Sequence, residues 1–599
     1  MKQSLCYAAD FETTTDINDC RVWAYSLCNV EDPSKFIYGN SIESFIDWCK
    51  EKENRTLYFH NLRWDAEFLL SYLGIHGYSF IEDKKERADC TYTTVISDTG
   101  EIYSLEIYFS VTKKHTNKVT IYDSMKIFPN FSVAKIADSF GMPISKLKID
   151  YHKYRPVGYE LDQQEIDYIR NDVEIVARAL KQMFDNGLTK MTLASDALTY
   201  YKGTIKNFRA TFPLLDEESD AIARASYKGG FTYVSDKYKE KIMGAGMTLD
   251  VNSLYPSILR YETLPYGWPV AFEGKYIPDE SYPLYVQTLT CKFRLKEGKI
   301  PSIQIKGSPF FVANEYLTDS KDDIVTLTLT SVDLKLFFDQ YDVEPLSWGG
   351  GLKFKAAKGL FDTYVDYWIG QKNKAKAENN PGQKQIAKNM ANSLYGKFGL
   401  SSIADKKIPI VSEDGKVEYR MICGEKRDTV YCPVATFVTS YGRDKTIRTS
   451  QAIRDWGIKN KGFDPYVYSD TDSVKILLQE SDLEYLKDVI KVDKYLLGYW
   501  DLEECFQKIL AIRQKCYITF SKGRVHPTIA GLPKYLAPII NFDNFRRGFT
   551  TVGLTIDDLK NMARINGATE EEIAEVHHKT TYKHCCGGLV LVDTDFTIK

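Results

Sequence analysis

The sequence predicts a multidomain protein that combines α/β and α+β regions. The chain has 599 residues, which is too long for one hydrophobic core and corresponds to roughly three to five packed units at ~100–200 residues each. Over residues 1–190, apolar strands and amphipathic helices alternate, which is typical of an α/β layer domain. The middle of the chain instead gathers strand-like segments and then two consecutive helices, which favours α+β architecture there.

The expected elements of the first region alternate in type along the chain. In order they are a strand at Leu5–Ala9, a helix capped by Ser41, a strand at Leu57–Phe59, a helix carrying Phe68 and Tyr72, a strand at Val119–Tyr122 and a long amphipathic helix from Asp162. This order predicts a layered sheet with helices on its faces.

The later elements are less regular. In order they are a strand at Met247–Leu249, short alternating segments between Gly267 and Gly351, a helix over Phe361–Ile369, a turn at Asn379–Gly382, a helix over Gln383–Phe398, strands at Pro465–Tyr468 and Val474–Leu478, and a final strand at Leu589–Val592 in a small appended unit. The two helices are expected to form an antiparallel hairpin.

Composition and charge limit the classes of function. Hydrophobic residues make up 44% and charged residues 27%, as in ordinary folded soluble proteins. We expect a cytosolic protein, because no apolar run approaches the ~18–20 residues that cross a bilayer and no secretion signal is visible. The 12 cysteines include no CxxC pair, which favours free thiols over zinc sites or disulfides.

The charge is unevenly distributed. The net charge is −3, yet the stretch from Lys353 to Lys397 holds nine lysines against three acidic residues. A positive strip of this kind in an acidic protein is suited to phosphates. A solvated helical face explains the charge equally well.

A first group of acids lies in the α/β region. Asp10 and Glu12 are two residues apart on a strand and therefore share a face, where they repel unless a cation lies between them. Asp65 follows the next strand, and Tyr168 and Asp172 lie at i and i+4 on the long helix. A single DxE pair more often only solvates a strand, but the ordered set predicts a two-metal site for phosphodiester cleavage.

A second group of acids follows later. Asp250 begins where an apolar strand ends, and Asp470 and Asp472 occupy the apex of a hairpin. A lone DTD is more often a polar turn, although acids bracketed by apolar strands are costly without a partner.

The second helix of the hairpin supplies a counter-charge. One stripe along it combines cations and an aromatic ring: Lys384, Lys388, Asn392 and Tyr395. Lysine suits triphosphate oxygens, whereas an ordinary amphipathic helix explains the charges but not the tyrosine. Acids that can hold metal ions, together with cations that can hold a triphosphate, predict nucleotidyl transfer.

These residues resemble the motifs of the protein-primed family B DNA polymerases of phi29-like bacteriophages, over essentially the whole chain. The exonuclease-like motifs are Asp10–Glu12, His60–Asp65 and Tyr168–Asp172, and the linker-like motif is Tyr227–Gly230. The polymerase-like motifs are Asp250–Pro256, Lys388–Gly396 and Tyr468–Ser473, and the primer-contacting motifs are Thr439–Arg443 and Lys515–Tyr517.

The resemblance implies a ribonuclease H-like 3′–5′ exonuclease domain followed by a right-hand palm, fingers and thumb with two insertions. The implied ranges are 1–190 for the exonuclease, 191–261 and 428–535 for the palm, 262–359 for a first insertion that contacts the priming protein, 360–399 for the fingers, 400–427 for a second insertion and 536–599 for the thumb.

The resemblance also implies residue roles. The metal ligands would be Asp250, the Val251 carbonyl, Asp472 and Asp470 for synthesis, and Asp10, Glu12, Asp65 and Asp172 for hydrolysis, with Tyr168 as a further catalytic residue. Nucleotide would be held by Tyr255, which excludes a 2′-hydroxyl, and by Lys372, Lys388, Asn392 and Tyr395. DNA would be contacted by His60, Asn61, Ser124, Lys146, Tyr151, Tyr227, Gly229, Gly230, Thr439, Arg443, Lys515 and Tyr517.

The implied function is processive, strand-displacing and protein-primed synthesis of linear phage DNA with intrinsic proofreading. Each active site would use two Mg²⁺ ions, with Mn²⁺ able to substitute. The expected partners are template and primer DNA, dNTPs and a terminal protein, and we expect a monomer without membrane contact in the cytoplasm of a bacterial host. The alternatives are a repair-type 3′–5′ exonuclease with a DNA-binding C-terminal half, a family B polymerase that extends only nucleic-acid primers, and a clamp or adaptor without catalysis.

Overall fold

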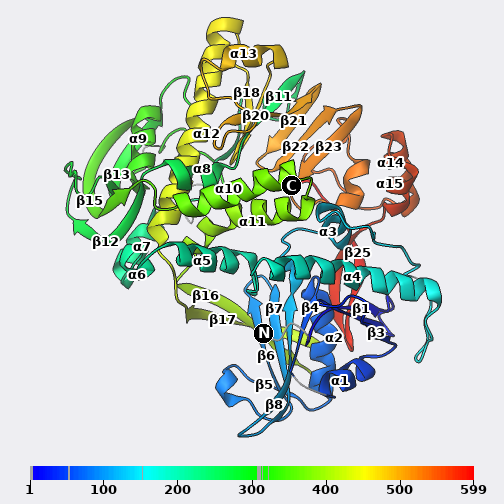
Figure 1. Ribbon diagram of the computed structural model, residues 1–599. Helices are drawn as coiled ribbons and strands as arrows, with labels where there is room; N and C mark the ends of the chain where they lie inside the picture. Colours follow the sequence, from blue (N-terminus) through cyan, green and yellow to red (C-terminus); the bar gives the residue numbers. More distant parts are fainter. Residues whose placement is uncertain (1–4, 52–53, 152, 306–311, 313, 322) are drawn as a thin grey trace.

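The computed structural model describes residues 5–51, 54–151, 153–305, 312, 314–321 and 323–599. Residues 1–4 of the expected exonuclease region and 306–311 of the expected first insertion therefore lie outside the described residues. Figure 1 shows a lower half built on an N-terminal sheet and an upper half that holds the other large sheets. Helices α4 (Gln163–Asp185) and α5 (Leu193–Thr204) run between the two halves.

The N-terminal sheet has ten strands in the order β17-β16-β6-β7-β8-β4-β1-β2-β3, with β5 paired to β6. Its strands are β1 (Cys6–Thr13), β2 (Val22–Asn29), β3 (Phe36–Gly39), β4 (Arg55–Phe59), β5 (Ser79–Phe80), β6 (Thr91–Ser97), β7 (Ile102–Val111), β8 (Thr116–Asp123), β16 (Ile403–Val411) and β17 (Val417–Lys426). Because β1, β4 and β8 are parallel, their carboxyl ends meet at one edge of the sheet. The acids that follow these strands are thereby brought to the same edge.

Helices cover both faces of this sheet. Helices α1 (Ile42–Lys50) and α2 (Leu62–Ile75) share a core with Ala9 and Leu57, whereas α4 shares the opposite core with Ala8 and Tyr58. Alternation along β1 and β4 explains the two cores, since neighbouring side chains on a strand point to opposite faces. The expected Ser41 cap is confirmed, because its side chain accepts the Ser44 N–H.

The upper half contains a central sheet in the order β20-β11-β19-β18-β9 and a second sheet in the order β10-β21-β22-β23. The central strands are β9 (Thr232–Val234), β11 (Gly246–Val251), β18 (Tyr466–Asp470), β19 (Ser473–Ile476) and β20 (Trp500–Phe506). The second-sheet strands are β10 (Ile242–Met243), β21 (Lys508–Arg513), β22 (Cys516–Ser521) and β23 (Arg524–Ile529). Strand β11 pairs with β19, so the two expected acid-bearing segments are neighbours in one sheet.

A separate four-stranded sheet differs from the short segments that the sequence predicts. It consists of β12 (Leu264–Phe272), β15 (Tyr341–Ala357), β13 (Leu284–Leu295) and β14 (Val325–Thr330), in that spatial order. Strand β15 has 17 residues, and Gly350 at φ +79° interrupts its apolar alternation without ending it. Helix α9 (Ser331–Gln340), capped by Thr330, was not expected.

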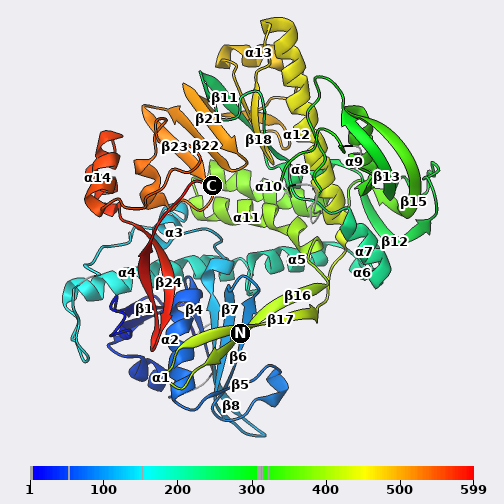
Figure 2. The same ribbon diagram turned by 180° about the vertical axis from the view of Figure 1, so that it is seen from behind.

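The expected helical hairpin is confirmed as α10 (Asp362–Ala377) and α11 (Pro381–Phe398). The remaining helices are α3 (Val133–Ser139), α6 (Phe208–Thr211), α7 (Glu217–Ala225), α8 (Leu254–Tyr261), α12 (Cys432–Lys461), α13 (Leu483–Leu486), α14 (Ile556–Ile565) and α15 (Glu570–Glu575). Figure 2 shows α10 and α11 between the central sheet and the lower half of the molecule.

The last two strands, β24 (Lys579–Cys585) and β25 (Gly588–Thr594), form a hairpin that crosses into the lower half (Figures 1 and 2). There it packs on α2, where a Cβ atom on Gly588 would lie 2.5 Å from the Phe68 ring. Glycine is therefore required for this close approach.

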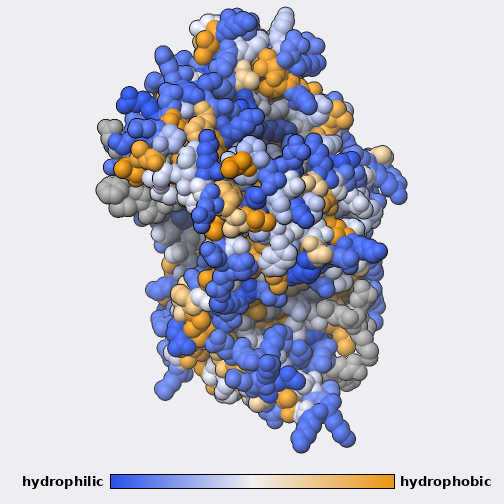
Figure 3. All heavy atoms as spheres, turned by 90° about the vertical axis from the view of Figure 1, so that its left-hand side faces the viewer, coloured by the Kyte–Doolittle hydropathy of each residue, from blue (hydrophilic) through white to orange (hydrophobic). Residues whose placement is uncertain are grey.

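The face of the molecule seen in Figure 3 is mainly hydrophilic. Its hydrophobic residues form small separate groups. Within the described residues, no helix combines the length and the apolar character needed to span a bilayer.

Candidate active sites

The first candidate site lies at the carboxyl edge of the N-terminal sheet, where the structure brings together four carboxylates. Asp10 and Glu12 come from β1, Asp65 from α2 and Asp172 from α4. The Phe11 N–H donates to Asp65 Oδ1 at 3.2 Å, which ties α2 to β1.

The four carboxylates influence one another's pKa values. Burial raises the pKa of Asp10 to about 7, and the nearby Asp172 carboxylate adds to this rise. Burial also raises the pKa values of Glu12 and Asp65 well above their ordinary range, and Asp10 contributes to both shifts. Carboxylates that repel one another in a buried site are stabilised by a cation.

Groups around Asp172 complete the first site. Lys146 Nζ donates to Asp172 Oδ2 at 2.8 Å, while Asp172 Oδ1 is buried without a hydrogen-bond partner. Tyr168 is buried, and its hydroxyl is 2.8 Å from that of the half-exposed Tyr151. The unpartnered oxygen is suited to a metal ion, because buried polar atoms are normally satisfied.

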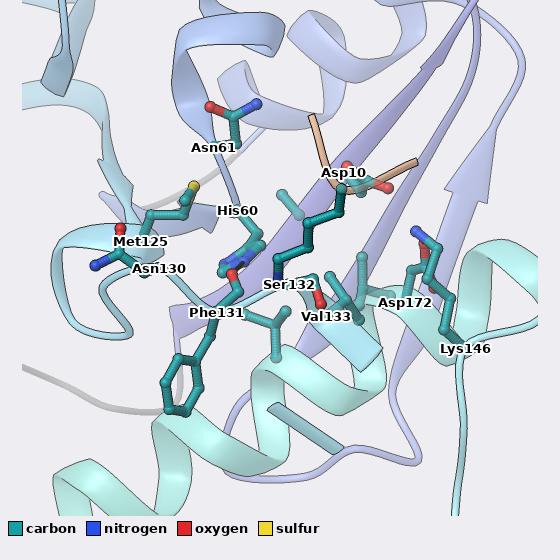
Figure 4. A pocket seen from close by; sticks show the side chains of 14 residues that line it. Asp10, His60, Asn61, Met125, Asn130, Phe131, Ser132, Val133, Lys146 and Asp172 are labelled. Atoms are coloured by element: carbon teal, nitrogen blue, oxygen red, sulfur yellow. Dashed lines mark hydrogen bonds and ion pairs between the residues drawn. The ribbon is translucent and has the colours of Figure 1, made fainter. Parts of the chain in front are cut away.

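A cavity of about 560 Å³ is lined by two of these carboxylates, Asp10 and Asp172. Figure 4 shows Asp10, Asp172 and Lys146 on one side of it and Asn61 and Met125 on the other. The cavity is large enough for several atoms of a nucleotide and combines carboxylate and amide groups.

The sequence-expected residues His60, Asn61 and Ser124 lie beside this cavity. Asn61 has φ +73° and begins α2, and its N–H donates to Asp123 Oδ1 at 3.1 Å. Ser124 is fully buried, and its hydroxyl is 2.9 Å from His60 Nδ1. Burial lowers the pKa of His60, which favours a neutral ring that Ser124 and the Phe131 carbonyl orient.

The second candidate site is centred on Asp250 and Asp472 in the central sheet. The Val251 N–H donates to the Asp472 carbonyl at 2.8 Å, so the two segments are in direct backbone contact. Burial raises the pKa of Asp250 to about 7, Asp472 adds to the rise, and Lys388 opposes it. Burial also raises the pKa of Asp472. The structure thus brings together the two acids that the sequence could not connect.

Thr471 separates the two aspartates of the hairpin turn. It adopts φ +56°, and its N–H donates to the Phe231 carbonyl at 2.7 Å. Asp470 has partners of its own: its carboxylate oxygens are each 3.2 Å from Lys515 Nζ, and Thr232 Oγ1 donates to it at 3.1 Å. Its charge also adds to the raised pKa of Asp472, which burial causes first. These contacts favour a role in orienting Lys515.

The helical hairpin brings Lys388 close enough to oppose the raised pKa of Asp250. Burial lowers the pKa of Lys372 on α10, and the Lys388 ammonium on α11 lowers it further, so the two lysines are neighbours. The Asn392 side chain donates to the Lys388 carbonyl at 3.0 Å. The rings of Tyr395 and Tyr255 lie 4.2 Å apart, which joins α11 to α8.

Two sequence-expected DNA contacts are turned into the protein. Thr439 is buried, and its hydroxyl donates to the Ala435 carbonyl of its own helix at 3.2 Å. Arg443 is buried and forms a two-point ion pair with Asp333, with nitrogen–oxygen distances of 3.0 and 2.6 Å.

Arg443 also fixes the linker-like loop. Its Nη1 donates at 2.7 Å to the carbonyls of Lys228 and Gly229. A Cβ atom on Gly230 would lie 2.6 Å from Thr471 Oγ1, so the loop follows the acidic turn closely. A Cβ atom on Gly399 would similarly meet the Tyr227 hydroxyl at 2.6 Å. Contacts within the protein therefore hold this loop beside the second site.

Lys515 and Tyr517 reach the site from the second sheet. Lys515 has φ +53°, and its N–H donates to the Tyr468 hydroxyl at 3.0 Å. The Tyr517 ring lies 4.9 Å from the Tyr468 ring. Both residues therefore contact β18, the strand that leads into the acidic turn.

Two acids near Asp250 were missed. Asp501 on β20 is the pairing partner of Asp250, and Glu503 on the same strand raises the pKa values of both Asp250 and Asp472. The only local signal was the acidic, alternating character of this strand, and it does not reveal which strand is its neighbour.

Neither site is a ready-made metal cage. The four carboxylates of the first site are near enough to influence one another, but within the described residues no three His, Cys, Asp or Glu side chains are placed so that together they could hold one metal ion. Mg²⁺ is commonly held by one or two carboxylates, with waters and substrate phosphates completing its coordination. The Asp250–Asp472 pair with the Val251 carbonyl, and the carboxylates around Asp172, fit that pattern of donors.

Comparison with known proteins gives the family. The model of the family "DNA polymerase type B, organellar and viral" matches residues 46–482. The chain is 40% identical to the DNA polymerases of Bacillus phages B103 and phi29, covering 99% of both chains in each case. It is 32% identical to the DNA polymerase of Streptococcus phage Cp-1, covering 96% of this chain and 98% of that protein.

Solved structures agree with the sequence matches. Phi29 DNA polymerase complexed with primer-template DNA and incoming nucleotide substrates aligns with a TM-score of 0.87 and 38% identity, covering 99% of this chain and 100% of that one. The same enzyme with single-stranded DNA aligns with a TM-score of 0.86 and 37% identity over the same shares. The expected fold, an exonuclease followed by a right-hand polymerase, is confirmed. The chain therefore belongs to the viral type B DNA polymerases, among the DNA-directed enzymes of the phi29-like phages.

Proposed function

We propose that this polymerase extends a primer at Asp250 and Asp472 and removes misplaced 3′ ends at the Asp10–Asp172 cavity. The observation that carries the proposal is the second site. The half-buried carboxylates of Asp250 on β11 and Asp472 in the β18–β19 turn lie on segments joined by a backbone hydrogen bond, and Lys388 on the helical hairpin opposes the raised pKa of Asp250. Acids opposite cations at such a site bind a metal-complexed triphosphate. The related complexes with primer-template DNA and nucleotides support DNA and dNTPs as the substrates.

The residues of the synthesis site divide the work. Asp250, Asp472 and the Val251 carbonyl hold Mg²⁺, which neutralises phosphate charge and lowers the pKa of the attacking hydroxyl when it is bound. Lys372 and Lys388 hold the triphosphate as point charges. Tyr255, backed by Tyr395, lies under the sugar of the incoming nucleotide and leaves no room for a 2′-hydroxyl. Asn392 is positioned by its bond to the Lys388 carbonyl.

The residues of the exonuclease site act in a similar way. Asp10, Glu12, Asp65 and Asp172 hold the divalent cations, and Lys146 partly neutralises Asp172 until they bind. Tyr168, held by Tyr151, orients the attacking water. Asn61 and Met125 line the cavity where a frayed 3′ end would lie, and His60, fixed by Ser124, lies beside them.

The wider function rests on the phi29-like relationship. It supports protein-primed, processive and strand-displacing replication of linear DNA by a monomer in the cytoplasm of a bacterial host, with Mn²⁺ able to replace Mg²⁺. The proposed domain ranges are those given by the sequence: exonuclease, palm, first insertion, fingers, second insertion and thumb. With these ranges, the β12–β15 sheet would form the first insertion and the β16–β17 hairpin the second.

The two sites are tested by reciprocal variants. Asp472→Ala should abolish dNTP incorporation on a primed template, because it removes one of the two central carboxylates, and should leave degradation of single-stranded 3′ ends intact. Asp10→Ala with Glu12→Ala should do the reverse. Gel assays of both reactions with labelled DNA and Mg²⁺ provide the measurement. Synthesis by Asp472→Ala at the wild-type rate would overturn the assignment.

Protein priming is tested separately. A labelled first nucleotide should become covalently joined to the terminal protein encoded with this polymerase, in a reaction that requires the chain and a divalent cation. The joined product survives denaturing electrophoresis and boiling. If the enzyme extends DNA primers but never labels a protein, it belongs with the polymerases that use nucleic-acid primers only.

A further inference from the structure

A buried lysine lies beneath the synthesis site and has no part in the proposed mechanism. Lys475 is on β19, three residues after Asp472, and is only 5% exposed. Lysine is rarely buried to this extent unless its charge has a partner. The partners of Lys475 therefore indicate what its charge does.

Lys475 belongs to one row of side chains across the central sheet. It pairs with Thr248 on β11, which pairs in turn with Glu504 on β20. Lys475 Nζ donates to Thr248 Oγ1 at 2.8 Å. Asp250 lies two residues beyond Thr248 on the same face of β11, because side chains alternate along a strand. The lysine row is thus the next row behind the Asp250 row.

The second sheet covers this row. The Lys475 ammonium lies over the Tyr517 ring at 4.9 Å from its centroid. Glu504, at the other end of the row, accepts a hydrogen bond from Ser521 on β22, the strand that also carries Tyr517. Lys475 therefore lies between the sheet that carries the aspartates and the strand that carries Tyr517.

The surrounding charges favour a charged lysine in this place. Burial lowers the pKa of Lys475, whereas Glu504, Glu503, Asp470 and Asp250 oppose that effect. A desolvated cation is attracted to a tyrosine face more strongly than an exposed one. A neutral side chain of similar length would fill the space but lose this attraction.

We propose that Lys475 is a positioning residue for DNA synthesis, whose buried ammonium holds the Tyr517 ring, and with it β22, at a fixed distance from Asp250. This inference rests on the proposed function and on the primer contact that the family resemblance implies for Tyr517. Misplacement of a reacting group by ~1 Å costs on the order of 100-fold in rate. A small shift of β22 therefore impairs synthesis without touching the exonuclease cavity in the other half of the molecule.

The test compares Lys475→Met with Lys475→Arg. Lys475→Met keeps the length of the side chain and removes the cation, so we expect kcat for dNTP incorporation to fall about tenfold. The KM for dNTP should change less than about twofold, because the triphosphate lysines are untouched. Lys475→Arg should recover most of the loss, since guanidinium also binds an aromatic face. Lys508→Met, at an exposed position on β21, is the matched control and should match the wild type.

Two further measurements separate positioning from damage to the fold. Degradation of single-stranded DNA by Lys475→Met should equal that of the wild type, because a correctly folded exonuclease cavity is retained. In a Tyr517→Leu background, Lys475→Met should lower kcat for dNTP incorporation by less than about a further twofold, since the two residues act through one contact. Equal loss of both activities without rescue by arginine, or independent effects of the two substitutions, would overturn the inference.

Asp472→Asn serves as the reference in the same assays. If Asp472→Asn still synthesises DNA, the proposed synthesis site itself is wrong. If Asp472→Asn is inactive while Lys475→Met synthesises at the wild-type rate, only the role of Lys475 is wrong.

Discussion

In each of the two sites, a bound cation would offset the unfavourable ionisation of an aspartate. Asp250 and Asp10 are both half-buried beside a second carboxylate, and burial raises the pKa of each to about 7. A carboxyl group whose pKa is raised by folding makes its full stabilising contribution at pH values below its pKa in the unfolded chain, which is ~4. That stabilisation is lost as the pH rises from ~4 through about 7, because burial disfavours the ionised groups in the folded state and they also repel neighbouring carboxylates.

The first prediction concerns metal and pH together. Saturating Mg²⁺ should raise the melting temperature more at pH 8 than at pH 6, because protons compete with the cation below about pH 7. Differential scanning fluorimetry of the metal-free chain with and without Mg²⁺ measures this. The Asp10→Asn, Asp250→Asn variant should lose most of the pH dependence. A Mg²⁺ effect that is independent of pH would contradict the predicted linkage.

The second prediction concerns sugar selection by Tyr255. Tyr255→Val removes the ring that Tyr395 supports, so the site gains room beside the sugar. Discrimination of dNTPs against rNTPs should fall at least about tenfold, or ~1.4 kcal/mol. The measurement is the ratio of kcat/KM for dATP and ATP. Tyr255→Phe is the matched control and should keep its selectivity, since the ring is retained.

At the scale of elements, a buried ion pair joins three segments that are distant in sequence. Asp333 on α9 pairs with Arg443 on α12, and Arg443 holds the carbonyls of the 228–230 loop beside the acidic turn. Ser440 also donates to Asp333, at 2.7 Å. Arg443 and hydrogen bonds from α12 keep the pKa of Asp333 below its usual range. The β12–β15 sheet is thereby anchored to the synthesis site.

The third prediction tests this anchor. Asp333→Ala leaves Arg443 buried and unpaired, so the free energy of unfolding should fall by ~3–5 kcal/mol. Asp339→Ala breaks the exposed Arg448–Asp339 pair, and its cost should be only ~0–1 kcal/mol. Urea denaturation of both variants measures the difference. Equal losses for the two variants would show that the buried pair does not anchor α9.

At the scale of the whole molecule, one buried carboxylate fastens two hairpins to the lower half. Glu67 on α2 accepts the Tyr419 hydroxyl of β17 at 2.6 Å, and its second oxygen is 3.2 Å from His584 Nδ1 on β24. The tips of the hairpins also meet, because Cys586 Sγ donates to Asp414 at 3.2 Å. The C-terminal hairpin and the β16–β17 hairpin therefore share a support.

The fourth prediction concerns the pH dependence of this joint. Glu67 raises the pKa of His584, while burial, Arg63 and Lys416 oppose the rise. The stabilisation is thus complete below the unfolded pKa of ~6.5 and is lost as the pH rises through the folded pKa. Hydrogen exchange in β24 should be faster at pH 8.5 than at pH 6, after correction for the intrinsic rate.

His584→Gln should remove this difference, and His115→Gln in an exposed turn should preserve it. Unchanged pH dependence in His584→Gln would place the titrating group elsewhere.

The sequence by itself determined the chemistry of both sites and most of the elements that carry them. Acid spacing on a strand, helix caps and apolar periodicity are local properties, so Asp10, Asp250 and the α10–α11 hairpin could be predicted from neighbouring residues alone. The resemblance of the ordered motifs to a known family then implied their roles.

Only the tertiary structure decided which of these segments meet. Strand pairing leaves little trace in the sequence of either partner when hundreds of residues separate them, so neither the addition of β16 to β6 nor the place of Glu503 beside Asp250 was predictable. Burial is decided in the same way: the packing of distant elements encloses Lys475 and Arg443, and the sequence predicts Arg443 only as a DNA contact. The residue type determines which group can carry a charge, whereas the fold determines whether that group is exposed to solvent and which partners it has.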